Sequence, residues 1–248
     1  KYSPFPEEMN RSITGVLTDL HFSPTEKAKK NLLKENVPKN NIFVTGNTVI
    51  DALIDGIEML DNYENSEIIS LKRKLNKEKK TILVTGHRRE NFGKGFENIC
   101  NALKEIVINN DVDIVYPVHL NPNVKDVVNE RLGSIDNIHL IKPLSYPSFL
   151  WIMKKSNIIL TDSGGVQEEA PSLGIPVVVL RDTTERPEGV EAGTAILVGT
   201  NKEKIVSTTE KLINDKKYYS KISQSINPYG TGQASEKILQ TVLNYERN

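Results

Sequence analysis

The sequence has a single cysteine, no net charge and no long hydrophobic run, and each shortage excludes a class of protein. With only Cys100 among 248 residues, an internal disulfide framework and a multi-cysteine metal site are excluded. The 32 basic residues are balanced by 32 acidic ones, so the chain has no broad positive surface for nucleic acid or an anionic membrane. No stretch approaches the roughly 20 apolar residues that cross a bilayer. We therefore expect a soluble, cytoplasmic protein without a metal site and without a nucleic-acid or membrane partner.

From about residue 41 onward, short β-branched runs alternate with longer helical patterns. This alternation is typical of βα units and indicates an α/β fold with a parallel sheet. Several runs are almost continuously apolar, as expected for strands covered on both faces. Cys100 lies in one of the helical patterns and is expected to be a buried thiol. The expected strands are residues 41–44, 81–85, 113–116, 138–141, 157–160 and 176–180, and the expected helices are residues 48–60, 95–107, 123–132, 147–154 and 166–173.

The length of the chain allows one or two domains, because a domain typically has about 100 to 200 residues, and we expect two. The polar segment 61–78 is predicted to be a linker with a short helix that leads into the main domain. Residues 201–223 and 234–246 are predicted to be terminal helices, separated by the Pro and Gly cluster of residues 227–232. A proline-containing loop is expected at residues 1–8, and since no initiator methionine precedes it, we expect the chain to begin partway through a structure.

A glycine-containing loop follows the predicted strand 157–160, and its sequence is Thr161-Asp162-Ser163-Gly164-Gly165. In open α/β sheets, ligands bind beyond the carboxyl ends of the strands, where helix N-termini also converge. Ser163 can cap the next helix, and the paired glycines let an anion such as a diphosphate approach backbone N–H groups. Glu169, one turn inside that helix, can accept two hydrogen bonds from a ribose diol. Taken alone, the segment is more simply interpreted as an ordinary capped helix.

A second loop, residues 181–188, favours an anion site over an ordinary capped helix. It is rich in hydrogen-bond donors and follows the next predicted strand. Arg186 has a planar guanidinium that suits phosphate oxygens, and Pro187 stiffens the chain beside it. Arg181 is a weaker candidate for the same contact. A surface loop held by ion pairs is the alternative interpretation. Two such loops at one sheet edge favour a phosphate site.

Another predicted strand ends in a loop with one histidine and three cations, His87, Arg88, Arg89 and Lys94. His87 can donate to a phosphate or exchange a proton near neutral pH, and its setting favours this over a structural role. His119 also follows a predicted strand, where a structural and a functional role are equally compatible with its position. Phe149 is either a core residue of a helix or an aromatic side chain that stacks on uracil. His21 and His139 have neighbours that favour structural roles.

Six segments together resemble the non-hydrolysing UDP-N-acetylglucosamine 2-epimerases, and they occur in the same order along the whole chain. They are residues 2–11, 45–51, 85–91, 117–122, 162–174 and 181–188. The resemblance implies two Rossmann-like domains of the glycosyltransferase B type, with the nucleotide sugar in the cleft between them. It also implies interconversion of UDP-N-acetylglucosamine and UDP-N-acetylmannosamine without a redox cofactor. The implied route is elimination of UDP to 2-acetamidoglucal, followed by re-addition with the opposite configuration at C2.

The same resemblance assigns roles to individual residues. Some bacterial members of the family also bind a second UDP-N-acetylglucosamine as an activator, and Arg88 and His119 match positions near that site. The catalytic residues implied are His87 and Glu7, those at the diphosphate are Ser163, Gly164, Gly165 and Arg186, the residue at the ribose is Glu169 and the residue at the uracil is Phe149.

The resemblance also divides the chain. Residues 1–45 correspond to the end of the amino-terminal Rossmann-like domain, residues 46–230 to the carboxyl-terminal UDP-binding domain, and residues 231–248 to a helix that crosses back to the first domain. Most of the amino-terminal domain, with most of the catalytic carboxylates, is therefore expected to be missing. A homodimer that serves polysaccharide biosynthesis is implied.

Three alternatives stay open. A hydrolysing relative would release UDP and free N-acetylmannosamine, and a glycosyltransferase of the same fold would turn over only with an acceptor. Without its partner domain, the chain could also be a UDP-binding module that has no catalytic activity.

Overall fold

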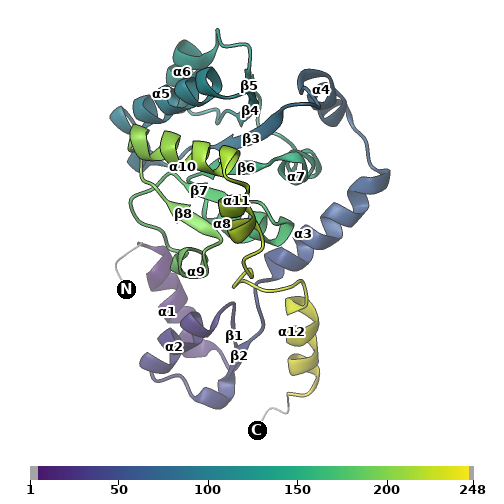
Figure 1. Ribbon diagram of the computed structural model, residues 1–248. Coiled ribbons are helices and arrows are strands. Elements are labelled where there is room, and N and C mark those ends of the chain that lie inside the picture. Colours follow the sequence, from purple (N-terminus) through teal and green to yellow (C-terminus); the bar gives the residue numbers. More distant parts are fainter. Residues whose placement is uncertain (1–4, 246–248) are drawn as a thin grey trace. The chain divides into compact units, whose positions relative to one another are not determined.

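The computed structural model describes residues 5–245, which fold into two compact units (Figure 1). The smaller unit combines the described residues up to Asp51 with those from Tyr229 onward, and the larger unit spans Ala52–Pro228.

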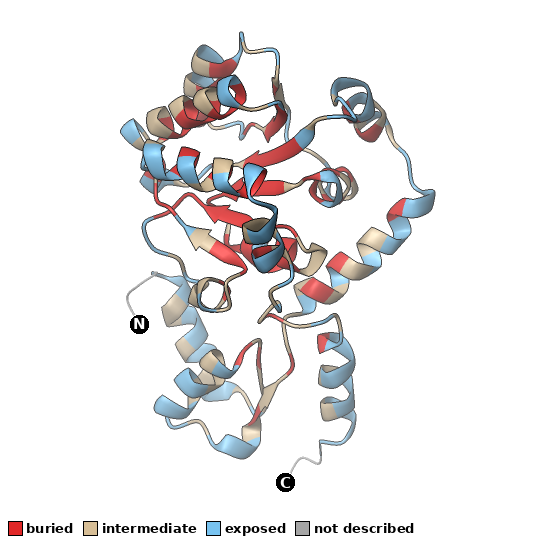
Figure 2. Cartoon of the chain, viewed as in Figure 1, coloured by how far each residue is buried: buried red, intermediate tan, exposed pale blue. Residues whose placement is uncertain are grey.

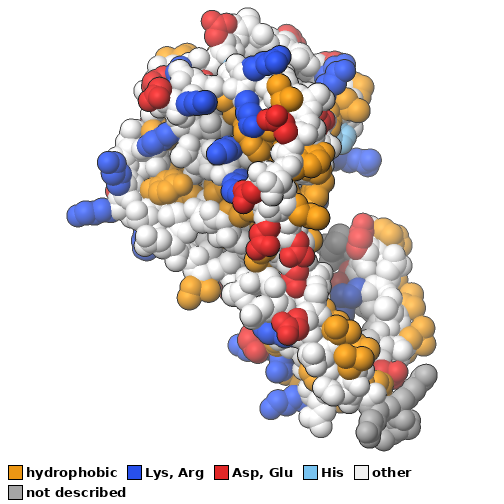
Figure 3. Space-filling model, turned by 90° about the vertical axis from the view of Figure 1, so that its right-hand side faces the viewer, with side chains coloured by type: hydrophobic (Ala, Val, Ile, Leu, Met, Phe, Trp, Pro, Cys, Tyr) orange, Lys and Arg blue, Asp and Glu red, His pale blue; other side chains and the backbone are white. Residues whose placement is uncertain are grey.

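Acidic and basic side chains are interspersed over the face shown in Figure 3, in keeping with the zero net charge. Within the described residues, no helix is long and apolar enough to cross a membrane.

A six-stranded sheet, parallel throughout, forms the centre of the larger unit. Its strand order is β5-β4-β3-β6-β7-β8, so the chain moves outward from β3 to one edge and then starts again at β6. The order reverses between β3 and β6, and such a switch point is where open α/β sheets bind ligands. The predicted α/β fold with a Rossmann-like parallel sheet is confirmed. The strands are β3 (Lys80–Thr85), β4 (Val112–Pro117), β5 (Ile138–Ile141), β6 (Ile158–Thr161), β7 (Val177–Val179) and β8 (Ala195–Leu197).

Both faces of this sheet are apolar and buried. On β3, Ile82 and Val84 belong to one buried cluster and Leu83 belongs to the other, because successive side chains point to opposite faces. This explains the near-continuous apolar runs of the sequence, and Figure 2 shows the buried residues concentrated in the strands. Helices that contribute to the first cluster are α5 (Lys94–Asn109), α6 (Pro122–Leu132), α10 (Lys202–Asn214) and α11 (Lys216–Ser223), and those that contribute to the second are α3 (Thr48–Met59), α4 (Ser66–Lys74), α7 (Tyr146–Lys155) and α8 (Gly164–Glu169).

Cys100 lies on α5 and is fully buried in the first cluster, as its helical pattern predicts. Burial raises the pKa of its thiol to about 11, because the charged thiolate loses hydration in an apolar setting. A thiol that stays protonated at neutral pH is a packing residue rather than a nucleophile.

Side-chain caps set the limits of several helices. Asn65 and Asn201 accept hydrogen bonds from backbone N–H groups in the first turns of α4 and α10. Asp215 ends α10 in an extended conformation, and its carboxylate then caps α11 by accepting from the Tyr218 N–H at 2.9 Å. The single helix predicted over residues 201–223 is therefore two helices, because Asp is unfavourable inside a helix and a good N-cap.

The smaller unit contains a two-stranded parallel sheet and its helices. These elements are β1 (His21–Ser23), β2 (Ile42–Val44), α1 (Glu7–Leu17), α2 (Glu26–Lys34) and α12 (Ala234–Leu243). The Asp51 carboxylate accepts from two backbone N–H groups at the start of α12, at 3.2 and 2.8 Å. Gly46 has a φ of +91° and lies against the backbone at Tyr229, whose carbonyl accepts from the Asn47 N–H at 2.7 Å. Segments far apart in the sequence are thus joined by hydrogen bonds within this unit.

Short elements account for most differences from the predicted secondary structure. β1 and β8 are absent from the prediction, because their three residues include at most one β-branched side chain, whereas the equally short β2 and β7 are richer in them. The loop expected at residues 1–8 reaches only Pro6, since α1 begins at Glu7, and residues 1–4 lie outside the described part. The polar segment 61–78 holds the expected short helix, α4, which buries Ile68 in the second cluster.

Candidate functional site

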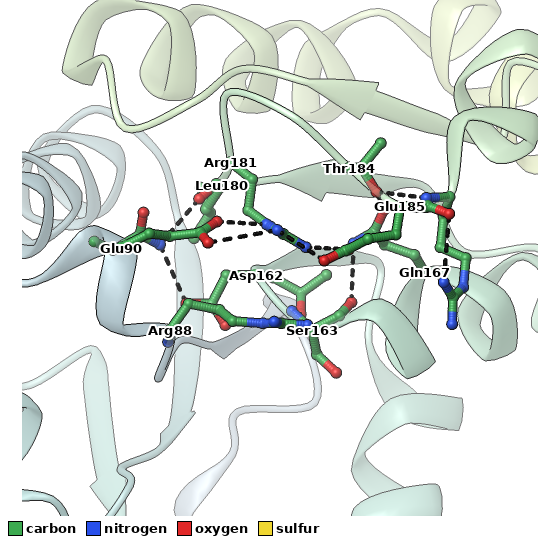
Figure 4. Close-up of polar contacts among 12 residues, drawn as sticks. Arg88, Glu90, Asp162, Ser163, Gln167, Leu180, Arg181, Thr184 and Glu185 are labelled. Atoms are coloured by element: carbon green, nitrogen blue, oxygen red, sulfur yellow. Dashed lines mark hydrogen bonds and ion pairs between the residues drawn. The ribbon is translucent and has the colours of Figure 1, made fainter. Parts of the chain in front are cut away.

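The loops that follow β3, β6 and β7 meet at the switch point, and Asp162 ties the first two together (Figure 4). Its fully buried carboxylate accepts hydrogen bonds from the backbone N–H groups of His87 and Arg88, both at 2.9 Å. The Asn91 side-chain amide donates to the same carboxylate at 3.2 Å and to the Leu180 carbonyl at 3.1 Å. Buried hydrogen bonds therefore hold these loops to one another.

The ends of β3 and β6 are packed too closely for larger side chains. A Cβ atom at Gly86 would lie 2.9 Å from the hydroxyl oxygen of Tyr116, which donates to the Gly86 carbonyl at 3.2 Å. The Thr85 and Thr161 hydroxyls are 2.5 Å apart, and Thr161 also accepts from the Ser163 N–H at 2.9 Å. The first residues of both loops are thus fixed by the strands that precede them.

Arg181 is a buried tie between the loops after β3 and β7. Figure 4 shows its guanidinium between two carboxylates, those of Glu90 and Glu185. It donates to Glu90 at 2.6 Å and to Glu185 at 2.5 Å. The Arg181 hydrogen bond lowers the pKa of Glu185 to about 2. Because Arg181 and Glu185 stay charged at neutral pH, Arg181 acts as a structural cross-link in the described loops.

Two other arginines converge on the backbone of Gly164, at the start of α8. A Cβ atom at Gly164 would lie 3.9 Å from the guanidinium carbon of Arg186 and 4.0 Å from a terminal nitrogen of Arg88. The buried Glu168 forms an ion pair with the Arg186 Nε, and Thr184 accepts from the Arg186 N–H at 3.0 Å. The Arg88 Nε is buried and has no hydrogen-bond partner among residues 5–245. Gly164 is buried and Gly165 beside it is exposed. Two guanidinium groups at these glycines form a site that suits a phosphate or diphosphate.

Ser163 occupies the N-cap position of α8, but its side chain makes no capping hydrogen bond, so the predicted side-chain cap is wrong. The residue is held through its backbone instead, because its N–H donates to Thr161 and its carbonyl accepts from the Gln167 side chain at 3.1 Å. The first-turn N–H groups of α8 are therefore not covered by Ser163. Gly165 lies two residues after Ser163. A Cβ atom built on it would be 3.9 Å from the Glu169 Oε2.

His87 begins the loop after β3, and 43% of its side chain is exposed. Its Nδ1 lies 3.4 Å from the Asp162 carboxylate, and its ring stacks on His119 with the centroids 5.6 Å apart and the planes at 18°. The His119 Nδ1 accepts from the Asn121 N–H at 3.1 Å. An imidazole that a buried carboxylate holds on one side and that is open to solvent can exchange a proton with a bound ligand.

Glu169 is a buried carboxyl group on α8, and 8% of the residue is exposed. Burial raises the pKa of this carboxyl to about 7, and the neighbouring Glu168 charge adds to the rise, whereas a hydrogen bond from Tyr146 opposes it. Phe149, one turn along α7 from Tyr146, is half-buried and packs against the second apolar cluster. Glu169 is thus a proton-sensitive acceptor near neutral pH.

The structure brings most of the predicted site residues into the larger unit and leaves Glu7 in the smaller one, at the start of α1. Within the described residues, no group of three or more His, Cys, Asp or Glu side chains is arranged to hold a metal ion. Asn91, Glu168 and Tyr146 are contact residues that the motifs did not single out. Their only signal in the sequence is position, because Asn91 and Glu168 lie within the segments 85–91 and 162–174 and Tyr146 lies three residues before Phe149. The predicted residues in the larger unit are His87, Arg88, His119, Phe149, Ser163, Gly164, Gly165, Glu169 and Arg186.

Comparison with known proteins gives close relatives over nearly the whole chain. The chain is 55% identical over 252 residues to the UDP-N-acetylglucosamine 2-epimerase of Campylobacter jejuni, covering 99% of this chain and 66% of that protein. It is 54% identical over 247 residues to the enzyme of the same name from Escherichia coli K12, covering 98% and 65%. The chain therefore spans slightly less than two thirds of the length of these relatives.

Solved structures agree with this grouping. The UDP-GlcNAc 2-epimerase of Neisseria meningitidis bound to UDP-GlcNAc superposes with a TM-score of 0.88 at 47% identity, over 98% of this chain and 66% of that chain. The S. aureus MnaA–UDP co-structure gives 0.88 at 49% identity, over 98% and 65%. Residues 1–243 match the family described as UDP-N-acetylglucosamine 2-epimerase. The chain therefore belongs to the UDP-N-acetylglucosamine 2-epimerase family.

Proposed function

We propose that this chain carries the UDP-binding part of a non-hydrolysing UDP-N-acetylglucosamine 2-epimerase, which interconverts UDP-N-acetylglucosamine and UDP-N-acetylmannosamine. The convergence of Arg88 and Arg186 on the backbone of Gly164, at the switch point of the sheet, is the observation that carries this proposal. The names of the relatives and the UDP-containing structures of two of them support it.

The proposed reaction has two balanced steps. Elimination removes the C2 proton and breaks the bond from C1 to the diphosphate oxygen, and the electrons of the C2–H bond form the C1–C2 double bond of 2-acetamidoglucal. Re-addition returns the diphosphate oxygen to C1 and a proton to the opposite face of C2. Both steps need donors for the charge on the leaving UDP and groups that move the C2 proton.

The residues of the larger unit fit the first of these needs. Arg186 and the Gly164 backbone would stabilise the leaving diphosphate, with Ser163 and Gly165 beside it. His87 would exchange a proton or donate to the diphosphate. Glu169 would accept from the ribose hydroxyls and Phe149 would lie at the uracil. Glu7, on α1, is the second proposed catalytic residue.

The finer features of the whole enzyme are also proposals. Residues 46–230 would form the UDP-binding domain, residues 1–45 part of the other Rossmann-like domain, and residues 231–248 the helix that returns to it. Arg88 and His119 would contact a second UDP-N-acetylglucosamine that activates the enzyme. A cytoplasmic homodimer that supplies polysaccharide biosynthesis is the proposed setting.

Incubation with UDP-N-acetylglucosamine in heavy water tests the proposal. Deuterium at C2, together with UDP-N-acetylmannosamine, is the expected result, because proton return comes from solvent. Release of free UDP at every turnover would instead identify a hydrolysing enzyme. UDP binding without exchange would identify a binding module without catalysis.

A further inference from the structure

The two carboxylate oxygens of Glu169 face different neighbours. Oε1 accepts a hydrogen bond from the Tyr146 hydroxyl at 3.5 Å. Oε2 lies 3.9 Å from the position that a Cβ atom would take at Gly165, so it faces the glycine backbone of the anion site. One oxygen is therefore held by α7, and the other lies along α8 towards the glycines at the start of that helix.

Tyr146 is the first residue of α7, and a polar cluster fixes the start of that helix. We call the cluster the α4–α7 clamp; it consists of Asn65, Glu67, Ser145 and Ser148. The Glu67 carboxylate accepts from the Ser145 N–H at 3.2 Å and from the Ser145 hydroxyl at 2.5 Å. Hydrogen bonds from Ser145 and Ser148 lower the pKa of Glu67, so the clamp holds a charged carboxylate at neutral pH.

The other half of the clamp links the same two helices. The Asn65 side-chain amide donates to the Ser148 hydroxyl at 2.9 Å, while its carbonyl oxygen accepts from the Ile68 N–H at 2.8 Å and caps α4. The Ser145 and Ser148 hydroxyls are joined at 3.0 Å. The start of α7 is therefore bonded to the start of α4 through both of its serines.

Helix α3 restricts α7 from another side. A Cβ atom at Gly56 would lie 2.5 Å from the Leu150 Cδ1 and 4.0 Å from the Tyr146 Cε1. The glycine allows α3 to lie directly against α7 at the turn that carries Tyr146. Tyr146 is 49% exposed, but one edge of its ring lies against α3 and its backbone belongs to the helix turn that the clamp holds.

We propose that Tyr146 is a positioning residue that orients the Glu169 carboxylate for a vicinal diol such as a nucleotide ribose, and that the α4–α7 clamp fixes Tyr146 for this task. The inference rests on the proposed function, because it takes Glu169 to be the ribose-binding group. A hydrogen bond from Tyr146 favours the charged carboxylate, which accepts from two hydroxyls, whereas a neutral acid accepts from them less well.

The test compares the dissociation constants of UDP and 2′-deoxy-UDP, measured by titration calorimetry on the full chain at pH 7.5. We expect the unmodified chain to prefer UDP by about 10-fold, as for a hydrogen bond to a charged group. Tyr146→Phe removes only the hydroxyl and should lower that preference to about threefold, with 2′-deoxy-UDP affinity unchanged. A purely structural role of Tyr146 would weaken both ligands equally, and that result would overturn the inference.

Further variants separate this inference from the proposed function. Glu169→Gln should reduce the preference for UDP to a similar or greater extent. If Glu169→Gln abolishes the preference while Tyr146→Phe keeps it, the inference is wrong and the proposed function stands. If the unmodified chain binds neither nucleotide, the proposed function fails and the inference fails with it. Equal affinity for both nucleotides in the unmodified chain would overturn the ribose role of Glu169 and hence the inference.

A matched pair of variants tests the α4–α7 clamp separately. Glu67→Gln weakens the bonds to Ser145 and should lower the UDP preference by about twofold. Glu64→Gln removes a neighbouring carboxylate that pairs with Lys72 at 2.5 Å, so it should leave the preference unchanged. An unchanged preference in Glu67→Gln, with Tyr146→Phe still effective, would remove the clamp from the proposal.

Discussion

The two edges of the six-stranded sheet carry similar polar residues but use them differently. At the amino ends of the strands, the Lys80 ammonium donates to the Ile213 carbonyl, and the Asp113 carboxylate accepts from the Asn76 N–H at 2.9 Å. At the carboxyl ends, Arg88 and Arg186 approach the Gly164 backbone together. Polar groups at the first edge bond to protein backbone, whereas the two arginines at the second edge converge on one stretch of glycine backbone.

Two histidines of the larger unit lie beside aspartates, one at each edge of the sheet, and they also differ in exposure. His139, near the amino ends, is half-buried beside Asp113 at 3.9 Å, and burial lowers its pKa. His87, at the carboxyl ends, is more exposed and stacks on His119. An imidazole–carboxylate pair therefore indicates function only together with its edge of the sheet, because helix N-termini and loops gather at the carboxyl edge.

The largest expected effect concerns this pair of histidines. In an active epimerase that contains these residues, His87→Ala should lower kcat by about 100-fold or more, because a positioned acid–base group is lost. UDP affinity should change by less than about threefold. His139→Ala is the matched control and should leave kcat unchanged. The rate of C2 deuteration measures kcat. Equal losses in both variants would contradict a functional role that is specific to the histidine at the carboxyl ends of the strands.

The next test compares UDP binding after removal of one cationic side chain at each edge of the sheet. Arg186→Ala should weaken UDP binding by about 30-fold, because a charged hydrogen bond to the diphosphate is lost. Lys80→Ala, at the other edge, should leave the dissociation constant unchanged because its ammonium bonds to a helix carbonyl. Titration calorimetry measures both. Unchanged UDP affinity in the Arg186 variant would exclude the phosphate role.

Glu169 predicts a dependence of stability on pH. Its pKa in the folded chain is raised to about 7, so above the unfolded value near 4.5 the unfolded chain loses this proton before the folded chain does. Stability is therefore lost as pH rises from about 4.5 to 7, and Glu169→Gln avoids that loss. At pH 8 the variant should gain about 1–2 kcal/mol of unfolding free energy.

Urea unfolding at pH 5 and pH 8 measures this difference. The gain in the Glu169 variant should be largest at pH 8 and small at pH 5. A gain of equal size at both values would show that the substitution acts through packing rather than through the charge of the carboxylate.

The smallest expected effect concerns the carboxylate at the amino edge. Asp113→Ala leaves the Asn76 N–H without its acceptor and should lower the free energy of unfolding by about 1 kcal/mol. UDP affinity should stay the same, because Asp113 lies at the edge away from the anion site. A clear fall in UDP affinity with little change in stability would contradict the structural role of this edge.

Much of the larger unit could be predicted because its strands are buried on both faces. Runs such as residues 82–84 are continuously apolar, and the polar loops that end them are visible as motifs. The break at Asp215 inside the predicted helix 201–223 was missed, since a single capping residue hardly alters the helical pattern around it. β8 was missed because only one of its three residues is β-branched, whereas the equally short β7 consists of three valines.

The candidate site was predictable as a set of loops but not as a set of contacts. Arg181 and Arg186 are similar arginines in one loop, yet Arg181 pairs with Glu90 and Glu185 whereas Arg186 meets Glu168 and faces Gly164. Nothing local distinguishes them, because their partners come from segments up to 91 residues away. Their different roles follow from which carboxylate each one reaches.

By itself, the sequence determined the alternation of strands and helices, the buried thiol of Cys100 and the polar loops at the strand ends, because these depend on local periodicity and composition. Only the tertiary structure decided which of these loops share an edge, through the reversal of strand order between β3 and β6. It also decided that Tyr146 meets Glu169 and that Asp162 meets His87, because hydrogen bonds and ion pairs act only over a few ångströms, between groups that the folded chain brings together.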